Sequence, residues 1–209
     1  MNNRYGAGAR FFHWLVVLLF LAQVPAGIAM VVPAQMGDFA ALPGVEQRTI
    51  DVIYIFHKGL GAVLIVVVFA RLLWRLTHPA PPWPPSMPAL EQRIATQTHW
   101  VMYLLMVLAV VTGYVHVVGL GFPMELLNAM GIPPLIPRME RAAVISSFMH
   151  RFTVVLLVGL VAIHIAEVFR HHWVLEDNIL GRMWPPFGTR NPYQPASGPR
   201  SPTGGVAPD

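Results

Sequence analysis

The fold is decided by the stretch Met149–Trp173, MHRFTVVLLVGLVAIHIAEVFRHHW, which is long and apolar enough to cross a membrane as a single helix. Two of its histidines, His150 and His164, are 14 residues apart. This separation is almost four helical turns, about 21 Å of rise, and places both side chains within about 40° of one face. Ionisable groups inside a membrane span are costly and tend to mark function. The stretch therefore predicts a transmembrane helix that presents two imidazoles at different depths.

The composition of the whole chain is that of a membrane protein. Of 209 residues, 55% are hydrophobic and 11% are charged, whereas a soluble domain carries about 25% charged residues. Mean hydropathy is +0.55, which excludes a soluble globular domain and a largely disordered chain. The sequence has nine histidines and no cysteine. Disulfides, iron–sulfur clusters, zinc–thiolate sites and c-type haem attachment are excluded, so a bound metal must use nitrogen or oxygen ligands.

Four apolar stretches predict an all-α membrane protein, a bundle of four transmembrane helices at about residues 9–32, 50–76, 96–118 and 142–172. The first stretch follows Arg4 and Arg10, as the apolar region of a cleaved signal peptide would. Its apolar run is too long for a signal peptide, however, and it contains His13 and Trp14. We therefore expect a retained helix. Residues 77–88 are rich in proline and predict a stiff link, residues 119–141 predict an outer loop with room for a short helix, and residues 184–209 predict a disordered tail.

The distribution of positive charge predicts the orientation in the membrane. On this topology nine of the Lys and Arg residues fall on one side, and five, Arg48, Lys58, Arg138, Arg141 and Arg151, fall on the other. Because positive residues concentrate in cytoplasmic segments, both termini are expected in the cytoplasm. The net charge of +4 is thus a signal of topology, and nucleic-acid binding has no support.

Depth in the membrane sorts the histidines into two pairs. His13 and His164 fall near the inner side, and His57 and His150 fall near the outer side. Imidazole is an axial ligand of haem, and helix bundles build cofactor sites from facing side chains. Two pairs at matched depth favour two b-type haems enclosed by the bundle. The alternative is a set of unrelated polar residues satisfied between helices.

Two more histidines lie in the third span but do not fit this pattern. His99 and His116 are 17 residues apart, which puts them about 100° apart around a helix. We expect neither to be a ligand, and His99 to be an interfacial residue beside Trp100. Gly59, Gly61 and Gly159 lie near the predicted ligands, where a missing side chain would let a flat macrocycle approach the backbone.

Three segments carry a resemblance to a known family: FFHWLVVLLF (11–20), FHKGLGAVLIVVVFARLLWRLTHPAPP (56–82) and MHRFTVVLLVGLVAIHIAEVFRHHWVLEDNILGRMWP (149–185). The chain resembles bacterial cytochrome b561, the four-helix dihaem family to which superoxide oxidase belongs, over nearly all of residues 5–185. The resemblance implies a cytochrome b domain at about residues 1–183, with His13 and His164 on an inner haem and His57 and His150 on an outer one. This chain departs from the family in a longer first outer loop (33–49) and in its Pro-rich tail.

The resemblance also implies a location, the inner membrane of a bacterial cell, and an activity. Superoxide would give electrons at the outer haem, and ubiquinone would be reduced at the inner side. Lys58 and Arg151 each follow an outer ligand directly, and either steer the superoxide anion or pair with haem propionates.

Arg71 and His171 are candidates for a quinone site. The alternative for Arg71 is that it anchors the inner end of its helix by its positive charge, and the alternative for His171 is an interfacial position beside Trp173. Glu167 either relays protons or balances Arg170.

A second class of function stays open at this point. Four-helix dihaem cytochromes also serve as membrane subunits that pass electrons between quinone and a docked dehydrogenase or hydrogenase, or a periplasmic cytochrome c. The expected partners are thus membrane lipid, quinone, and either superoxide or a periplasmic electron donor. A haem-free structural membrane protein is a third possibility, and the colour of the purified protein decides it.

Overall fold

The structure, a computed structural model, describes residues 4–35, 47–84, 87–177 and 179–184. These residues form four long helices, α1 (Ala7–Gln35), α2 (Gln47–Thr77), α3 (Ala89–Gly119) and α5 (Glu140–Trp173), with the short helix α4 (Glu125–Ala129) and the 3₁₀ turn η2 (Leu180–Arg182). No strand occurs in the described part of the chain. All four long helices are long and apolar enough to span a membrane. The predicted all-α four-span architecture is confirmed, whereas the predicted tail after Trp184 and most of the long first loop lie outside the described residues.

The third helix begins seven residues before its predicted start. Pro88 stands immediately before α3, and its carbonyl accepts a hydrogen bond from the Gln92 backbone at 3.1 Å. Because proline lacks an N–H, it is suited to the start of a helix, where no intrahelical hydrogen bond from that position is lost. The polar residues after it extend the helix beyond the apolar section. Hydropathy marks the part of a helix that is in the membrane, and the helix itself is longer.

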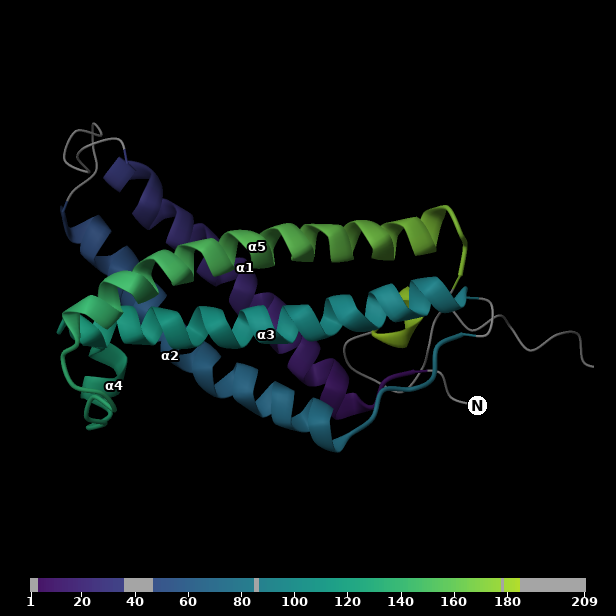
Figure 1. The fold of residues 1–209 in the computed structure, drawn as a ribbon, viewed down its shortest axis with the longest axis horizontal. Helices are drawn as coiled ribbons and strands as arrows, with labels where there is room; N and C mark the ends of the chain where they lie inside the picture. Colours follow the sequence, from purple (N-terminus) through teal and green to yellow (C-terminus); the bar gives the residue numbers. More distant parts are fainter. Residues whose placement is uncertain (1–3, 36–46, 85–86, 178, 185–209) are drawn as a thin grey trace, which may run out of the picture.

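The helices alternate in direction, so the bundle has two distinct ends (Figure 1). At the terminal end, α1 begins and α5 finishes, and the backbone N–H of Tyr5 reaches the carbonyl of Arg182 at 3.1 Å. At the α4 end, α1 leads towards α2, and α3 leads through α4 to α5. Helix α3 packs along α5, α1 packs on α2, and α2 joins the two pairs through α3. Among the described residues the backbone of α5 lies close to that of α3 and farther from those of α1 and α2, which it meets through side chains.

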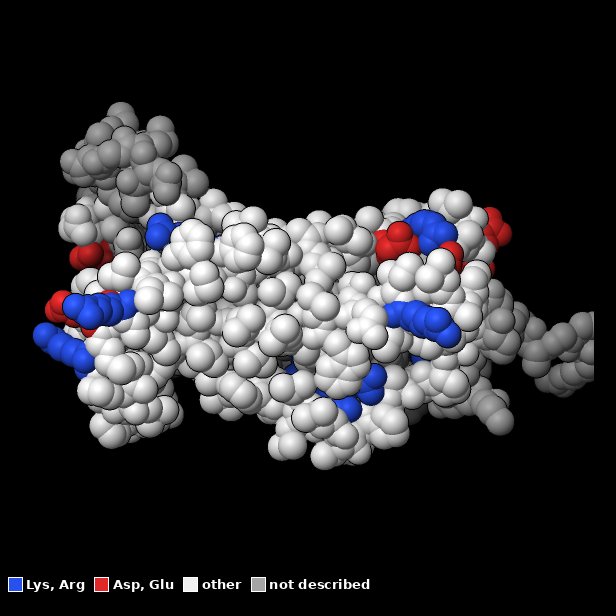
Figure 2. Space-filling view, viewed as in Figure 1, with Lys and Arg blue, Asp and Glu red and all other residues white. Residues whose placement is uncertain are grey.

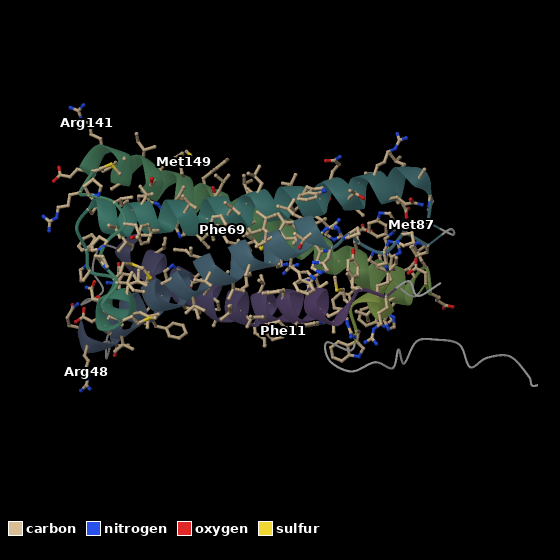
Figure 3. All side chains as sticks on the ribbon, turned by 90° about the horizontal axis from the view of Figure 1, so that it is seen from below. Phe11, Arg48, Phe69, Met87, Arg141 and Met149 are labelled. Atoms are coloured by element: carbon tan, nitrogen blue, oxygen red, sulfur yellow. The ribbon has the colours of Figure 1, made fainter. Side chains whose placement is uncertain are left out.

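An apolar layer occupies the middle of the bundle. Its most buried members are Leu157 of α5 and Val68 of α2, joined by Val16, Leu64, Leu105 and Met106. Leu157 lies halfway along α5 between His150 and His164. Large apolar side chains such as Leu18, Val66 and Val155 are exposed on the outside, and Figure 2 shows charged residues gathered towards the two ends with a nearly uncharged section between them. This is the surface expected of a helix bundle in lipid.

Candidate functional site

The predicted outer pair of histidines meets at the α4 end. His57 of α2 and His150 of α5 face each other with ring centroids 6.4 Å apart and ring planes at 86°. Two imidazoles on opposite sides of one iron hold their centroids about 6 Å apart, because each metal–nitrogen bond is about 2 Å long. The described residues contain no group of three metal-binding side chains, but a haem needs only two from the protein. The spacing of His57 and His150 fits a six-coordinate haem.

The surroundings of His150 hold it in the protonation state that an iron ligand needs. Its Nδ1 lies 2.8 Å from the carbonyl oxygen of Ala109. Since a carbonyl only accepts, Nδ1 carries the proton and Nε2 keeps a lone pair for the metal.

Glycines of the neighbouring helices lie against both rings. A Cβ at Gly27 of α1 would come within 3.1 Å of His57 Cε1, and one at Gly113 of α3 within 3.0 Å of His150 Cε1. The glycines that the sequence singled out for a flat macrocycle have other surroundings. Gly59 instead faces Leu126 of α4, Gly61 faces Gln23, and Gly159 has nothing within 4 Å.

The predicted inner histidines come together at the terminal end with a third one. His13 of α1 lies close enough to interact electrostatically with both His164 and His99. The rings of His99 and His164 have centroids 5.5 Å apart, and His99 is parallel to Trp83, within 3° at 6.3 Å. The expectation that His99 is an interfacial residue beside Trp100 therefore missed its place in this cluster.

The angular argument from the sequence did not anticipate this position of His99, and whether His99 is a ligand stays a prediction. Helices packed along their length approach 3.5 residues per turn relative to each other, which reduces the angle between residues 17 apart to about 50°. Helix α3 packs on α5 in this way, so His99 lies beside His164 while His116 interacts with His150.

Arg71 of α2 lies directly beside a predicted ligand. Its Nη2 is 3.1 Å from His13 Nδ1, and its Nε is 3.4 Å from the hydroxyl of Tyr103. A guanidinium only donates hydrogen bonds, so Nδ1 of His13 accepts and a neutral ring carries its proton on Nε2. This tautomer is opposite to that of His150. The contact with His13 shows that Arg71 does more than anchor a helix end. A haem held through Nε2 of His13 would need the proton of that ring on Nδ1, and this nitrogen would then need another partner than Arg71.

His171, the other quinone-site candidate, is buried at the terminal end. Its Nδ1 lies 2.6 Å from Oδ2 of Asp177, whose other oxygen accepts the backbone N–H of Ile179 at 3.1 Å. Only 5% of its surface is exposed, which disfavours a simple interfacial position beside Trp173. No hydrogen bond joins it to Arg71 in the described residues.

The segment after α5 closes the terminal end. The buried Arg182 donates to the carbonyls of Pro81 at 2.7 Å and Pro82 at 3.0 Å, and its guanidinium lies over the rings of Trp83 and Tyr5. Burial lowers the pKa of Arg182. One arginine thus ties the Pro-rich link and the N-terminal segment to the end of the chain, and Trp83 brings this cap against His99. Sequence reasoning noticed the motif around Arg182 without assigning it this role.

The two cations predicted at the outer site differ in their surroundings. Lys58 donates to Glu125 Oε1 at 2.6 Å and to the carbonyl of Pro123 at 2.9 Å, so its charge is neutralised and it holds α4 on α2. Arg151 is exposed and forms no ion pair within the described residues.

Glu167 was expected either to relay protons or to balance the charge of Arg170. In the structure it forms an ion pair with Arg170 at 2.9 Å, and Arg170 also forms one with Glu91 at 3.2 Å.

Four membrane-spanning helices that bring histidines together at two levels define a class of haem-binding membrane cytochrome. The sequence profile described as "Prokaryotic cytochrome b561" matches residues 4–186, and the chain belongs to this family. Membership implies a b-type haem and electron transfer within a membrane.

Individual relatives support the same family. "Cytochrome b561 homolog 2" of Escherichia coli (strain K12) is 25% identical, over 87% of this chain and 91% of its own length. "Probable superoxide oxidase CybB" of Yersinia pestis is 26% identical, over 88% of this chain and 98% of its own. "Cytochrome b561 homolog 1" of Escherichia coli (strain K12) is 25% identical, over 88% and 98%.

Proposed function

We propose that the protein holds two b-type haems, one between His57 and His150 and one between His13 and His164, and carries electrons across a bacterial inner membrane. The observation that carries the proposal is the 6.4 Å separation of the His57 and His150 rings. Bound haem would supply one-electron oxidation and reduction, and the two histidines of each pair would hold it. Ala109 keeps His150 in the ligating tautomer, and the apolar layer around Leu157 excludes water between the two levels.

The proposed donor is superoxide at the α4 end, which we place on the outer side by the positive-inside rule. Each superoxide gives up one electron and becomes oxygen, so two superoxide anions and two protons convert one ubiquinone to ubiquinol. The name of the Yersinia relative supports this donor. The exposed Arg151 attracts an anion to this end, whereas the charge of Lys58 is taken up by Glu125.

The proposed acceptor, ubiquinone, is reduced at the terminal end. Here the His171–Asp177 pair holds a proton at Nδ1 of His171, close in sequence to the ligand His164. Arg71 adds a fixed positive charge beside His13 and His164, which stabilises an electron arriving at this level.

The test begins with purified wild-type protein, which we expect to contain two haems per chain. Alanine at His57 or His164 should remove one haem each, because each haem then lacks an axial ligand. Alanine at His78, which stacks on Trp74 in the Pro-rich link, is the matched control and should retain both. Retention of both haems by the His164 variant would overturn the ligand assignment.

The same preparation tests the donor and the acceptor. Addition of superoxide should reduce the haems within the mixing time of a stopped-flow experiment, and addition of ubiquinone should then reoxidise them. If superoxide does not reduce the haems but ubiquinol does, the proposed donor is wrong.

That outcome would favour the second candidate, a membrane subunit that exchanges electrons with a docked protein. One observation supports it. Next to α4 lies a hollow of about 680 Å³, lined by apolar residues such as Phe122, Leu127 and Ile136 with Arg138 at its edge. A docked partner could occupy this hollow, and reduction of the haems by a periplasmic cytochrome c would identify it.

A further inference from the structure

Two buried polar atoms near the outer site lack a hydrogen-bond partner among the described residues. They are Nδ1 of His57 and Oε1 of Gln23. The opposite ligand differs, because Nδ1 of His150 lies 2.8 Å from the carbonyl of Ala109. A buried polar atom without a partner is uncommon in native proteins and requires an explanation.

The two residues are already in contact through other atoms. Nε2 of Gln23 donates to the backbone carbonyl of His57 at 3.1 Å. Because a carbonyl only accepts, this contact fixes which end of the amide is the nitrogen. Oε1 is therefore the end left over, and it is an acceptor.

The free nitrogen of His57 is turned towards the helix that carries Gln23. Gly27 lies one turn after Gln23 on the same face of α1, and a Cβ there would be 3.1 Å from Cε1 and 3.6 Å from Nδ1 of His57. The Nδ1 edge of the imidazole thus lies against the face of α1 that presents the amide. Gly27 adds no side chain that would compete for this nitrogen.

We propose that Gln23 is a positioning residue for the outer haem ligand: its Oε1 accepts a hydrogen bond from Nδ1–H of His57 when Nε2 binds iron. The inference rests on the proposed haem between His57 and His150. An iron ligand that uses Nε2 carries its proton on Nδ1, and in this buried position that proton needs an acceptor. Gln23 supplies to His57 what the carbonyl of Ala109 supplies to His150.

Such a bond has a measurable electronic effect. A hydrogen bond from Nδ1 makes the imidazole a stronger electron donor, which favours ferric over ferrous iron and fixes the ring plane. Loss of the acceptor should therefore make the outer haem easier to reduce. We expect the ferric/ferrous equilibrium to shift about tenfold, which is 59 mV for a one-electron couple. Haem affinity at this site should fall about 10-fold or more.

The experiment is a redox titration of the purified holoprotein with electron paramagnetic resonance spectra of both ferric haems. Gln23→Met removes the acceptor with little change of volume and should raise the potential of one haem while the other stays unchanged. Gln23→Glu keeps an acceptor oxygen in either protonation state and should leave that potential at or below the native value. Gln97→Leu, at an exposed position of α3, is the control and should change neither haem.

Two results would overturn the proposal. Native potentials and haem content in Gln23→Met would show that Nδ1 uses another acceptor, and an equal shift of both haems would show a general effect on the bundle. Should Gln23→Met fail to accumulate in the membrane, Gln23→Asn, whose amide is one methylene shorter, must give the same upward shift of one haem. A wild-type protein without haem at His57 and His150 would instead refute the proposed function, so the two failures are distinguishable.

Discussion

Gly113 should be required for full affinity at the proposed outer haem site, because a methyl group there would meet the ring of His150. The Cβ of an alanine would lie 3.0 Å from Cε1 and 3.1 Å from Nδ1, whereas carbon atoms prefer a separation of about 3.5–4.0 Å. To restore this separation the imidazole must move by about 0.5–1 Å. The same ring is held by Ala109, one turn earlier on α3, through a bond of 2.8 Å. A shift of that size lengthens the bond beyond the usual limit of about 3.2 Å.

Gly113→Ala should therefore weaken binding of the outer haem by about 10- to 100-fold, the usual effect of losing a hydrogen bond that orients a metal ligand. Gly6→Ala, at an exposed position ahead of α1, is the control, since nothing lies within 4 Å of the added carbon.

The assay is haem content per chain by the pyridine haemochrome method, followed by transfer of haem to an excess of apomyoglobin to obtain relative affinity. In Gly113→Ala one haem should leave faster than in the native protein and the other at the native rate. Equal retention of both haems in Gly113→Ala and Gly6→Ala would refute the reasoning, because the predicted displacement of His150 would then have no consequence.

Three further substitutions test the charged groups at the two ends. Replacing Arg71 with Gln removes a positive charge beside the proposed inner haem and should lower the reduction potential of that haem by an amount that corresponds to about 1–3 kcal/mol. A redox titration measures the potential, and Arg71→Lys, which keeps the charge, should retain most of the native value. Asp177→Asn replaces the carboxylate that accepts a hydrogen bond from Nδ1 of His171. It should slow reoxidation of the haems by ubiquinone and leave their reduction by superoxide at the native rate, so equal slowing of both half-reactions in stopped-flow spectroscopy would contradict it. Glu125→Gln releases Lys58 from its ion pair of 2.6 Å and should speed reduction by superoxide several-fold at low ionic strength. The gain should shrink in salt, and an unchanged rate would mean that charge at this position does not guide the donor.

Sequence patterns alone predict the architecture and the pairing of the four proposed ligands, because both follow from one-dimensional properties. Apolar length gives the spans, their alternating direction gives the depth of each histidine, and 14 residues bring His150 and His164 to one face of α5. The structure brings His57 to His150 and His13 near His164 as expected. No contact between different helices was needed for these predictions.

What the sequence could not predict depends on the side chains of neighbouring helices. The ion pair of Lys58 needs the position of Glu125 on α4, and the contact of Gly113 with His150 needs the packing of α3 on α5. His99 shows the same limit. A helical wheel with 3.6 residues per turn gives the angle between two side chains around a single straight helix. When two helices pack along their length, the angle between the same side chains relative to the partner helix follows about 3.5 residues per turn.

The two levels of histidines should respond to mutation independently, and this independence underlies every test that compares one haem with the other. His150 and His164 are separated by about 21 Å of helix, and the buried layer of Leu157, Val68 and their neighbours lies between the levels. Substitutions more than about 10 Å apart that share no partner usually have additive effects. The double variant His150→Ala/His164→Ala should therefore lose both haems, and its protein should still reach the membrane, because the apolar layer that packs the four helices is untouched. If either single variant already loses both haems, the layer does not insulate the two levels and each site depends on the other for its structure.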